Sequence, residues 1–340
     1  MNRSMKRAQG ALTITLILAA LSVTGCVGLR LRRVNTSVRR PSNVALYFSV
    51  ETRSGQPVAG LAAKQFKIYE DGRLISPYES KQTILNPDVA VEHYIVLLMD
   101  LSGSIVESGS LPKLIGAASA FTDRVARGRK VAIFGFDGRK RLIPVVGFTE
   151  DPAAVKAALA RLQNHKVKDP STNLNGAVVQ AIDKLKRGMA SSSRPLTFGT
   201  LVVFSDGSDR AHRVTTKKMY EVVEKSPVNV FVIGLGGEMR RGELSRLGRD
   251  GYVTATDDKN IKAAFDQVAN RIEAQGRKFY LLSYCSPSRA GKHKLRVEVT
   301  WQGKHGGLEH AFNARGFRPG CDPKQKPSFS LRRVRMKHTK

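Results

Sequence analysis

Apolar strands alternate with amphipathic helices through the middle of the chain, from His93 to about residue 275. This alternation predicts a parallel β-sheet, because each crossover helix returns the chain so that the next strand lies beside the last. Most of these strands are apolar on both faces, so helices should cover both sides of the sheet. We therefore expect a doubly wound α/β domain at residues 91–276. Its expected strands are 94–99, 130–136, 142–146, 200–204 and 228–233, and its expected helices are 111–125, 153–162, 175–186, 217–224 and 261–272.

The segments on either side of this domain have a different pattern. They are rich in β-branched and aromatic residues or alternate apolar with polar positions, and turn residues separate them. Such segments predict short antiparallel strands. We expect residues 43–90 and 277–322 to form one small β-sandwich that the α/β domain interrupts. The strand-like segments are 44–51, 66–70, 279–284 and 294–301.

The N-terminus has the organisation of a secretory signal. Residues 1–7 carry three positive charges, and residues 11–23 are uncharged and apolar, a run too short to span a bilayer comfortably. The run ends in Val23-Thr24-Gly25-Cys26, which resembles the lipobox of bacterial lipoproteins, where the cysteine becomes the lipidated first residue. We expect residues 1–25 to be a lipoprotein signal peptide. The alternative is an ordinary signal peptide followed by an incidental cysteine.

Lipidation of Cys26 would place the protein in the cell envelope, anchored to a bacterial membrane and facing either the periplasm or the cell surface. The acyl chains of a bacterial lipoprotein exceed what stable anchoring requires. Residues 26–42 are rich in Arg, Ser and Asn, which favours a flexible spacer between the lipid and the fold. The tail at residues 323–340 is basic and has no core pattern, so we expect it to be disordered.

If Cys26 carries lipid, the chain has two further cysteines, Cys285 and Cys321. In an exported, oxidising setting these two thiols have one possible pairing. We therefore predict a disulfide between them. Two free thiols are the alternative, since sequence alone does not give the separation of their Cα atoms.

Side-chain oxygens cluster at three junctions of the predicted α/β domain. Asp100, Ser102 and Ser104 follow the first buried strand, Thr172 comes just before a helix, and Asp206 ends a later strand. Loops at the carboxyl ends of parallel strands converge near the topological switch point, so we expect these oxygens to meet. Carboxylate and hydroxyl oxygens suit a hard cation, and Mg²⁺ is the first choice. The competing interpretation is that these residues only cap helices and build turns.

The spacing adds a specific resemblance. The sequence DLSGS, then a threonine before an Ala-containing helix, then a strand that ends in SDG, resembles the metal-ion-dependent adhesion site of von Willebrand factor type A domains. The resemblance implies that Ser102 and Ser104 coordinate the cation directly and that Thr172 binds it directly or through water. Asp100 and Asp206 would hold metal-bound waters or coordinate. It further implies that a carboxylate of a protein partner fills an open position, with Mn²⁺ or Ca²⁺ as alternatives to Mg²⁺.

Other chemistry has little support in the sequence. The glycines of Gly234-Leu235-Gly236-Gly237 lack the spacing of a dinucleotide-binding turn, and the histidines are scattered without a zinc motif. Val203 replaces the first glycine that a serine nucleophile elbow requires before Ser205. We therefore expect a non-catalytic protein with no small-molecule substrate.

The chain is strongly basic, with a formal net charge of +29. Such a charge attracts anionic surfaces of many kinds. The basic stretches lack interleaved aromatic residues for base stacking, which argues against nucleic acid. The second functional hypothesis is therefore a basic envelope-surface protein that binds anionic glycolipid or cell-wall polymer, with the metal site only structural.

Overall fold

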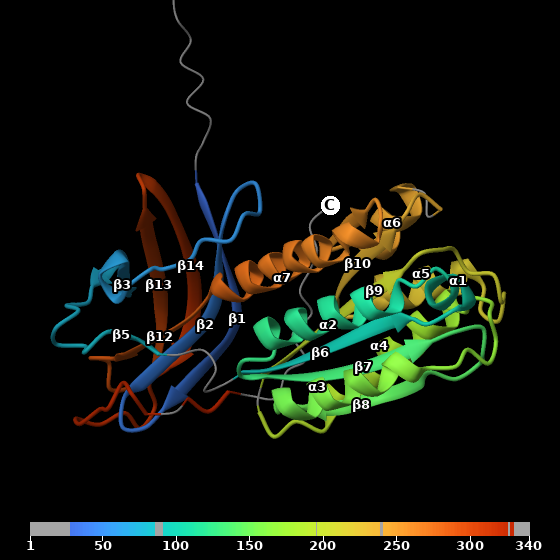
Figure 1. Ribbon diagram of the computed structural model, residues 1–340. Coiled ribbons are helices and arrows are strands. Elements are labelled where there is room, and N and C mark those ends of the chain that lie inside the picture. Colours follow the sequence, from blue (N-terminus) through green and yellow to red (C-terminus); the bar gives the residue numbers. More distant parts are fainter. Residues whose placement is uncertain (1–27, 86–90, 195, 239–240, 326, 330–340) are drawn as a thin grey trace, which may run out of the picture.

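The computed structural model describes residues 28–85, 91–194, 196–238, 241–325 and 327–329. The expected signal peptide at residues 1–25 and the expected lipidated Cys26 lie outside the described residues. Within the described ranges, no helix is both long and apolar enough to cross a membrane. The chain folds into a layered α/β domain beside a smaller pair of antiparallel sheets (Figure 1).

A six-stranded, mostly parallel sheet forms the centre of the α/β domain, as predicted. Its order is β11-β10-β9-β6-β7-β8, so β6 lies in the middle and the chain leaves it on both sides. Only β8 runs antiparallel to its neighbour, at one edge. The strands are β6 (Val91–Asp100), β7 (Arg129–Phe136), β8 (Ile143–Thr149), β9 (Leu196–Ser205), β10 (Asn229–Leu235) and β11 (Gly251–Ala255).

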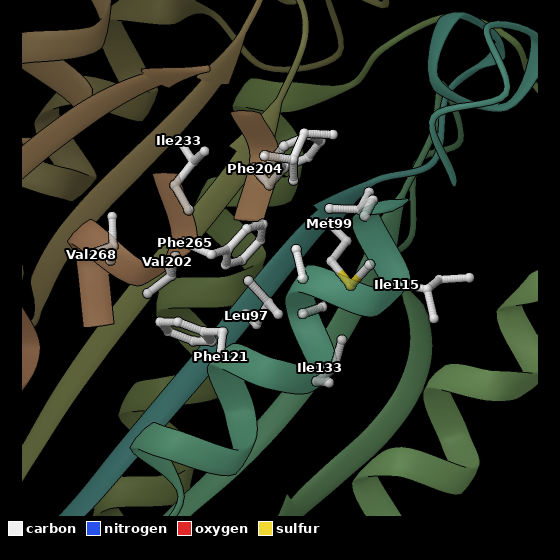
Figure 2. Packing of buried hydrophobic residues seen from close by; sticks show 14 of the residues in the cluster. Leu97, Met99, Ile115, Phe121, Ile133, Val202, Phe204, Ile233, Phe265 and Val268 are labelled. Atoms are coloured by element: carbon white, nitrogen blue, oxygen red, sulfur yellow. The ribbon is translucent and has the colours of Figure 1, made fainter. Parts of the chain in front are cut away.

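Helices cover both faces of this sheet, and each face buries its own apolar core. On one face Phe121 and Phe265 meet edge to face with ring centroids 5.5 Å apart, and Phe204 stacks on Phe265 (Figure 2). Burying such side chains contributes about 2 kcal/mol each, which fixes the helices on the sheet. α1 (Gly103–Glu107), α2 (Leu111–Val125), α3 (Pro152–Ala160) and α7 (Ile261–Arg277) pack on this face, and α4 (Leu174–Ala190), α5 (Thr216–Lys225) and α6 (Arg241–Leu247) pack on the other.

Segments from both ends of the chain build the flanking sandwich, as expected. One sheet has the order β1-β2-β12-β5 and the other β14-β13-β3-β4. A shared apolar core, with Phe48, Phe66 and Tyr280 at its centre, holds the two sheets together. The strands are β1 (Leu29–Arg39), β2 (Asn43–Thr52), β3 (Phe66–Glu70), β4 (Arg73–Leu74), β5 (Thr83–Leu85), β12 (Phe279–Cys285), β13 (Lys292–Trp301) and β14 (Lys304–Asn313).

The expected flexible spacer at residues 26–42 is wrong for most of its length. Residues 29–39 form β1, which pairs antiparallel with β2 from Leu29↔Thr52 to Arg39↔Asn43. The pattern was misleading because β1 is an edge strand. Its arginines lie on or near the surface, while Leu29, Asn35 and Ser37 are buried. Charged residues are a common feature of edge strands, which they protect from pairing with other chains.

The expected disorder of residues 323–340 is also wrong where the structure describes that tail. Phe329 is buried against Tyr47, with ring centroids 6.4 Å apart, and the backbone N–H of Ser328 donates to Ser37 Oγ. The buried Phe329 side chain and this hydrogen bond hold the described part of the tail against the fold. Phe329 joins an apolar cluster that also contains Phe198 and Phe279 and that connects the sandwich to the α/β domain.

The predicted disulfide is confirmed. Cys285 ends β12 and is bonded to Cys321, with their Cα atoms 5.8 Å apart. The bond ties the segment after β14 back to the sheet that contains β12. A loop of this length is expected to stabilise the fold by about 2–4 kcal/mol, mainly by restricting the unfolded chain.

Candidate metal centre

Asp100 ends the central strand and is completely buried. Its Oδ1 accepts a hydrogen bond from the backbone N–H of Ser102 at 3.0 Å, and its Oδ2 accepts one from Ser205 Oγ at 2.6 Å. The carboxylate is therefore held at the carboxyl end of the sheet by one group from the loop after β6 and one from the adjacent strand β9.

Ser102 and Ser104 lie at the start of α1. Ser102 occupies the N-cap position, yet its side chain makes no capping hydrogen bond. Its Oγ instead lies 3.3 Å from Ser104 Oγ. A serine that served only as a cap would bond a backbone N–H in the first turn of the helix. Helix capping therefore does not account for this hydroxyl.

Thr172 is buried in the loop before α4, and backbone contacts hold this loop against the other two. Gly103 N donates to Pro170 O at 3.0 Å, and Arg210 N donates to Thr172 O at 2.8 Å. A Cβ at Gly103 would lie 2.9 Å from the Pro170 Cβ, closer than such atoms approach in practice. Glycine in DLSGS thus lets the two loops touch.

Asp206 follows the last residue of β9 and is partly buried. The Ser104 side chain lies near enough to its carboxylate to offset part of the rise in pKa that burial causes. Its Oδ1 is nevertheless buried without a hydrogen-bond partner in the described part of the chain. Buried polar atoms are nearly always paired, so an orphaned carboxylate oxygen calls for an explanation.

The two carboxylates are electrostatically unfavourable as they stand. Burial raises the pKa of Asp100 to about 7, and the charge of Asp206 adds to this effect beyond what hydrogen bonds from Ser102 and Ser205 offset. Burial also raises the pKa of Asp206, and Glu238 contributes in the same direction. Both shifts mean that the cost of burying the ionised carboxylates is not fully offset by the groups around them.

The donor set fits a hard divalent cation. The structure brings Asp100, Ser102, Ser104 and Asp206 together by side-chain contacts and holds the loop of Thr172 beside them through its backbone. Within the described ranges, no three His, Cys, Asp or Glu residues are grouped so that they could hold a metal by themselves, so a metal site here depends on serine and threonine oxygens as well. The oxygens are carboxylates and hydroxyls, the types that suit Mg²⁺, Mn²⁺ or Ca²⁺.

Several residues that position the site were missed from the sequence. Ser205 orients Asp100, and its signal was a polar residue directly after the apolar run at residues 201–204. Asn175 N donates to Asp209 Oδ1 at 2.9 Å, which ties the start of α4 to the loop after Asp206. Asn173 caps α4 through Gly176 N and donates to Arg139 O at 2.9 Å. Asn and Asp in loops are too common for their sequence positions to reveal such contacts.

Comparisons with known proteins identify the family of the α/β domain. Residues 95–278 match the model of the von Willebrand factor type A domain, and the match spans more than half of the chain and all five predicted site residues. No curated protein matches the chain.

Three solved structures illustrate its similarities. A von Willebrand factor type A protein from Catenulispora acidiphila is 12% identical, with 88% of this chain and 76% of that chain covered and a TM-score of 0.47. Manganese-loaded TRAP protein from Plasmodium vivax is 13% identical, with coverages of 74% and 99% and a TM-score of 0.44. Proximal thread matrix protein 1 from the mussel byssus, with a zinc-occupied MIDAS motif, is 16% identical, with coverages of 61% and 49% and a TM-score of 0.43.

Proposed function

Because the chain belongs to the von Willebrand factor type A domain family, we propose that it binds a protein partner through a divalent cation held by five residues. These are Asp100, Ser102, Ser104, Thr172 and Asp206. Domains of this family are typically adhesion or interaction modules. The observation that carries the proposal is Asp206 Oδ1, an orphaned buried oxygen next to a carboxylate whose pKa burial raises to about 7.

A bound cation would stabilise the ionised forms of the two buried carboxylates. When bound, it supplies two positive charges that stabilise both ionised carboxylates. Ser102 and Ser104 contribute hydroxyl oxygens that add no negative charge, so the two aspartates only balance the cation and a carboxylate from outside can still coordinate it. Mg²⁺ is our first choice for the cell, with Mn²⁺ or Ca²⁺ as alternatives.

The surroundings favour an acidic partner. Arg210 is 66% exposed and lies near enough to Asp206 to oppose part of the rise in its pKa, while Arg213 is also exposed on the same loop. Their guanidinium groups pair with Glu238 and Asp169 but remain open to solvent. Exposed positive groups around a binding site raise the encounter rate with an acidic surface.

We also propose that this role is binding without catalysis. Ser205 ends β9, where a serine nucleophile would stand after a strand. It is fully buried, however, and its hydroxyl donates a hydrogen bond to Asp100. That proton is therefore engaged in positioning a carboxylate. The oxygens of the site are arranged to hold a cation and a partner in place.

Finally, we propose that lipidated Cys26 anchors the protein in the cell envelope. The basis is the lipobox-like sequence at residues 23–26, outside the described part of the chain. Incorporation of labelled palmitate in a bacterial host should be lost in Cys26→Ser, and labelling that persists in this variant would contradict the anchor.

Affinity capture tests the binding function. The fragment 28–340 contains all three sheets and their cores and can serve as bait with envelope extract in Mg²⁺. We expect a partner that chelator releases and that Asp100→Asn bait does not retain. Its binding should survive salt better than a purely electrostatic contact would. A partner released equally by salt alone and retained by Asp100→Asn would contradict the proposal.

A further inference from the structure

A cavity of about 670 Å³ lies where the α/β domain meets the sandwich. It is formed at the ends of α2 and α7, with His93 from the start of β6, Tyr47 from β2 and Phe279 from β12. These are the amino ends of the central strands, so the cavity and the candidate metal centre lie at opposite ends of the sheet. Figure 1 shows α2 and α7 ending on the side of the sandwich, away from α1.

Four arginines line this cavity, namely Arg124, Arg127, Arg129 and Arg277, against one acidic lining residue, Glu273. The carboxylate of Glu273 is already shared. Its Oε1 lies 3.1 Å from Arg124 Nη2, and its Oε2 lies 3.9 Å from Arg277 Nη2. Asp266, outside the lining, also pairs with Arg124 at 3.3 Å. The lining residues still carry more positive than negative charge, and an anion that enters would reduce the repulsion among them.

Arg127 adds to this excess. Its side chain is exposed, and it has no salt bridge to any residue in the described ranges. Helix C-termini favour basic side chains, which explains Arg124 and Arg277 in the last turns of α2 and α7. Arg129 donates to Val125 O at 3.2 Å and so also serves the end of α2. Helix capping does not account for Arg127, nor for the fact that all four arginines line one cavity.

The shape of the cavity depends on two further residues. Gly276 is next to the last residue of α7, and a Cβ added there would lie 3.3 Å from Arg129 Nη2. The absent side chain leaves room in front of the guanidinium. His93 stacks on Phe198 with ring centroids 5.3 Å apart. Burial lowers the pKa of His93 to about 3, so the imidazole is neutral and the guanidinium groups alone supply the positive charge.

We propose that this cavity binds an anion that carries phosphate groups, at a site separate from the metal centre. Guanidinium groups recognise phosphate through paired, charge-assisted hydrogen bonds, which favour arginine over lysine at such sites. The volume lies within the range of small-ligand sites, roughly 300–1,000 Å³. It accommodates a phosphorylated headgroup or a small soluble phosphate ester.

Calorimetric titration of sodium pyrophosphate into fragment 28–340, in 0.15 M salt with chelator, tests the site. We expect saturable binding that Arg127→Glu combined with Arg277→Glu weakens by about tenfold or more. Arg161→Glu is the matched control, an exposed arginine after α3 and outside the cavity lining. It should change the affinity by less than about twofold, because salt screens distant charges.

Gly276→Leu separates cavity binding from general attraction to charge, because it narrows the cavity in front of Arg129 without removing the charge of any arginine. We expect it to weaken pyrophosphate binding as well, whereas Asp100→Asn should leave that binding unchanged. The proposal would be overturned by a native protein without saturable binding, by equal losses in Arg161→Glu, or by native affinity in Gly276→Leu.

Vesicles then distinguish the two sources of phosphate. Phosphatidylcholine vesicles that contain phosphatidylglycerol should sediment the native fragment, but not the Arg127→Glu and Arg277→Glu double variant, if the site takes a lipid headgroup. Binding of pyrophosphate without sedimentation on vesicles would assign the site to a soluble phosphate.

Discussion

The sandwich and the α/β domain each bury a carboxylate, and they treat it differently. In the sandwich, Glu70 is 4% exposed, and hydroxyl groups of Tyr284, Ser286 and Ser288 donate to its two oxygens at 2.8, 3.1 and 2.7 Å. In the α/β domain, Asp100 also accepts hydrogen bonds, but Asp206 lies beside it with an oxygen that has no partner in the described chain.

The difference shows how a structural carboxylate can be told from one that is ready for a ligand. Glu70 belongs to a network in which each oxygen is satisfied, and such networks hold a unique packing together. Asp100 and Asp206 instead lie close enough for the charge of Asp206 to act on Asp100, and burial raises the pKa of both. The first arrangement is complete within the protein, whereas the second has an unpaired oxygen that the proposed cation would satisfy.

The largest expected effect is the pH dependence of the metal-free protein. Between the ordinary pKa of an aspartate and the raised value of about 7, folded Asp100 keeps a proton that the unfolded chain has released. The contribution of Asp100 to the free energy of unfolding should therefore fall as pH rises from about 4 to 7, by roughly 4 kcal/mol in total, and level off above pH 7.

Urea denaturation of fragment 28–340 in chelator measures this change, and Asp100→Asn provides the reference because its amide does not titrate. The difference in stability between the variant and the native fragment should grow in favour of the variant up to about pH 7. A constant difference across this range would mean that Asp100 is not destabilised by its surroundings.

Glu70→Ala should have the next largest effect, on stability alone. It leaves three hydroxyl groups without their acceptor, and Tyr284 is completely buried. We expect a loss of about 3 kcal/mol in the free energy of unfolding. Glu79→Ala, at an exposed turn position, should cost less than about 0.5 kcal/mol. The comparison fails if Glu70→Ala folds normally but loses Mg²⁺ binding.

Ser205→Ala sharpens the comparison at the metal end. It removes the 2.6 Å hydrogen bond that orients Asp100 but none of the proposed ligands. Removal of such a supporting contact typically reduces metal affinity by about 10- to 100-fold, and we expect the lower end because Ser102 N still holds Oδ1. Titration of Mg²⁺ measures this, with Ser226→Ala, a buried serine at the end of α5, as the control.

The sequence predicted long elements with a strong pattern. The run before Asp100 is apolar on both faces, so β6 and the helix at Leu111–Val125 were placed within a few residues. Short elements were missed, including α1, α6 and β11, because a few residues carry too little periodicity. β1 and Phe329 were misjudged because arginines surround the few buried side chains that dock them.

The candidate site was predictable as a set of oxygens but not as a structure. DLSGS and SDG follow apolar strands, and parallel strands bring such loops to one edge. Nothing in the sequence shows that Ser102 avoids its capping bond, or that Asp206 Oδ1 is left without a partner. Those facts depend on how three loops pack, and the arginine cavity likewise depends on the contact between two domains.

Isothermal titration of Mg²⁺ into fragment 28–340 tests the central claim most directly, with Asp100→Asn and the exposed Asp123→Asn titrated alongside. Mg²⁺ should bind the native fragment and Asp123→Asn at one site. Asp100→Asn should give no binding heat while its circular dichroism stays native. Absence of binding in the native fragment, or equal binding in a folded Asp100→Asn, would contradict a cation held between these loops.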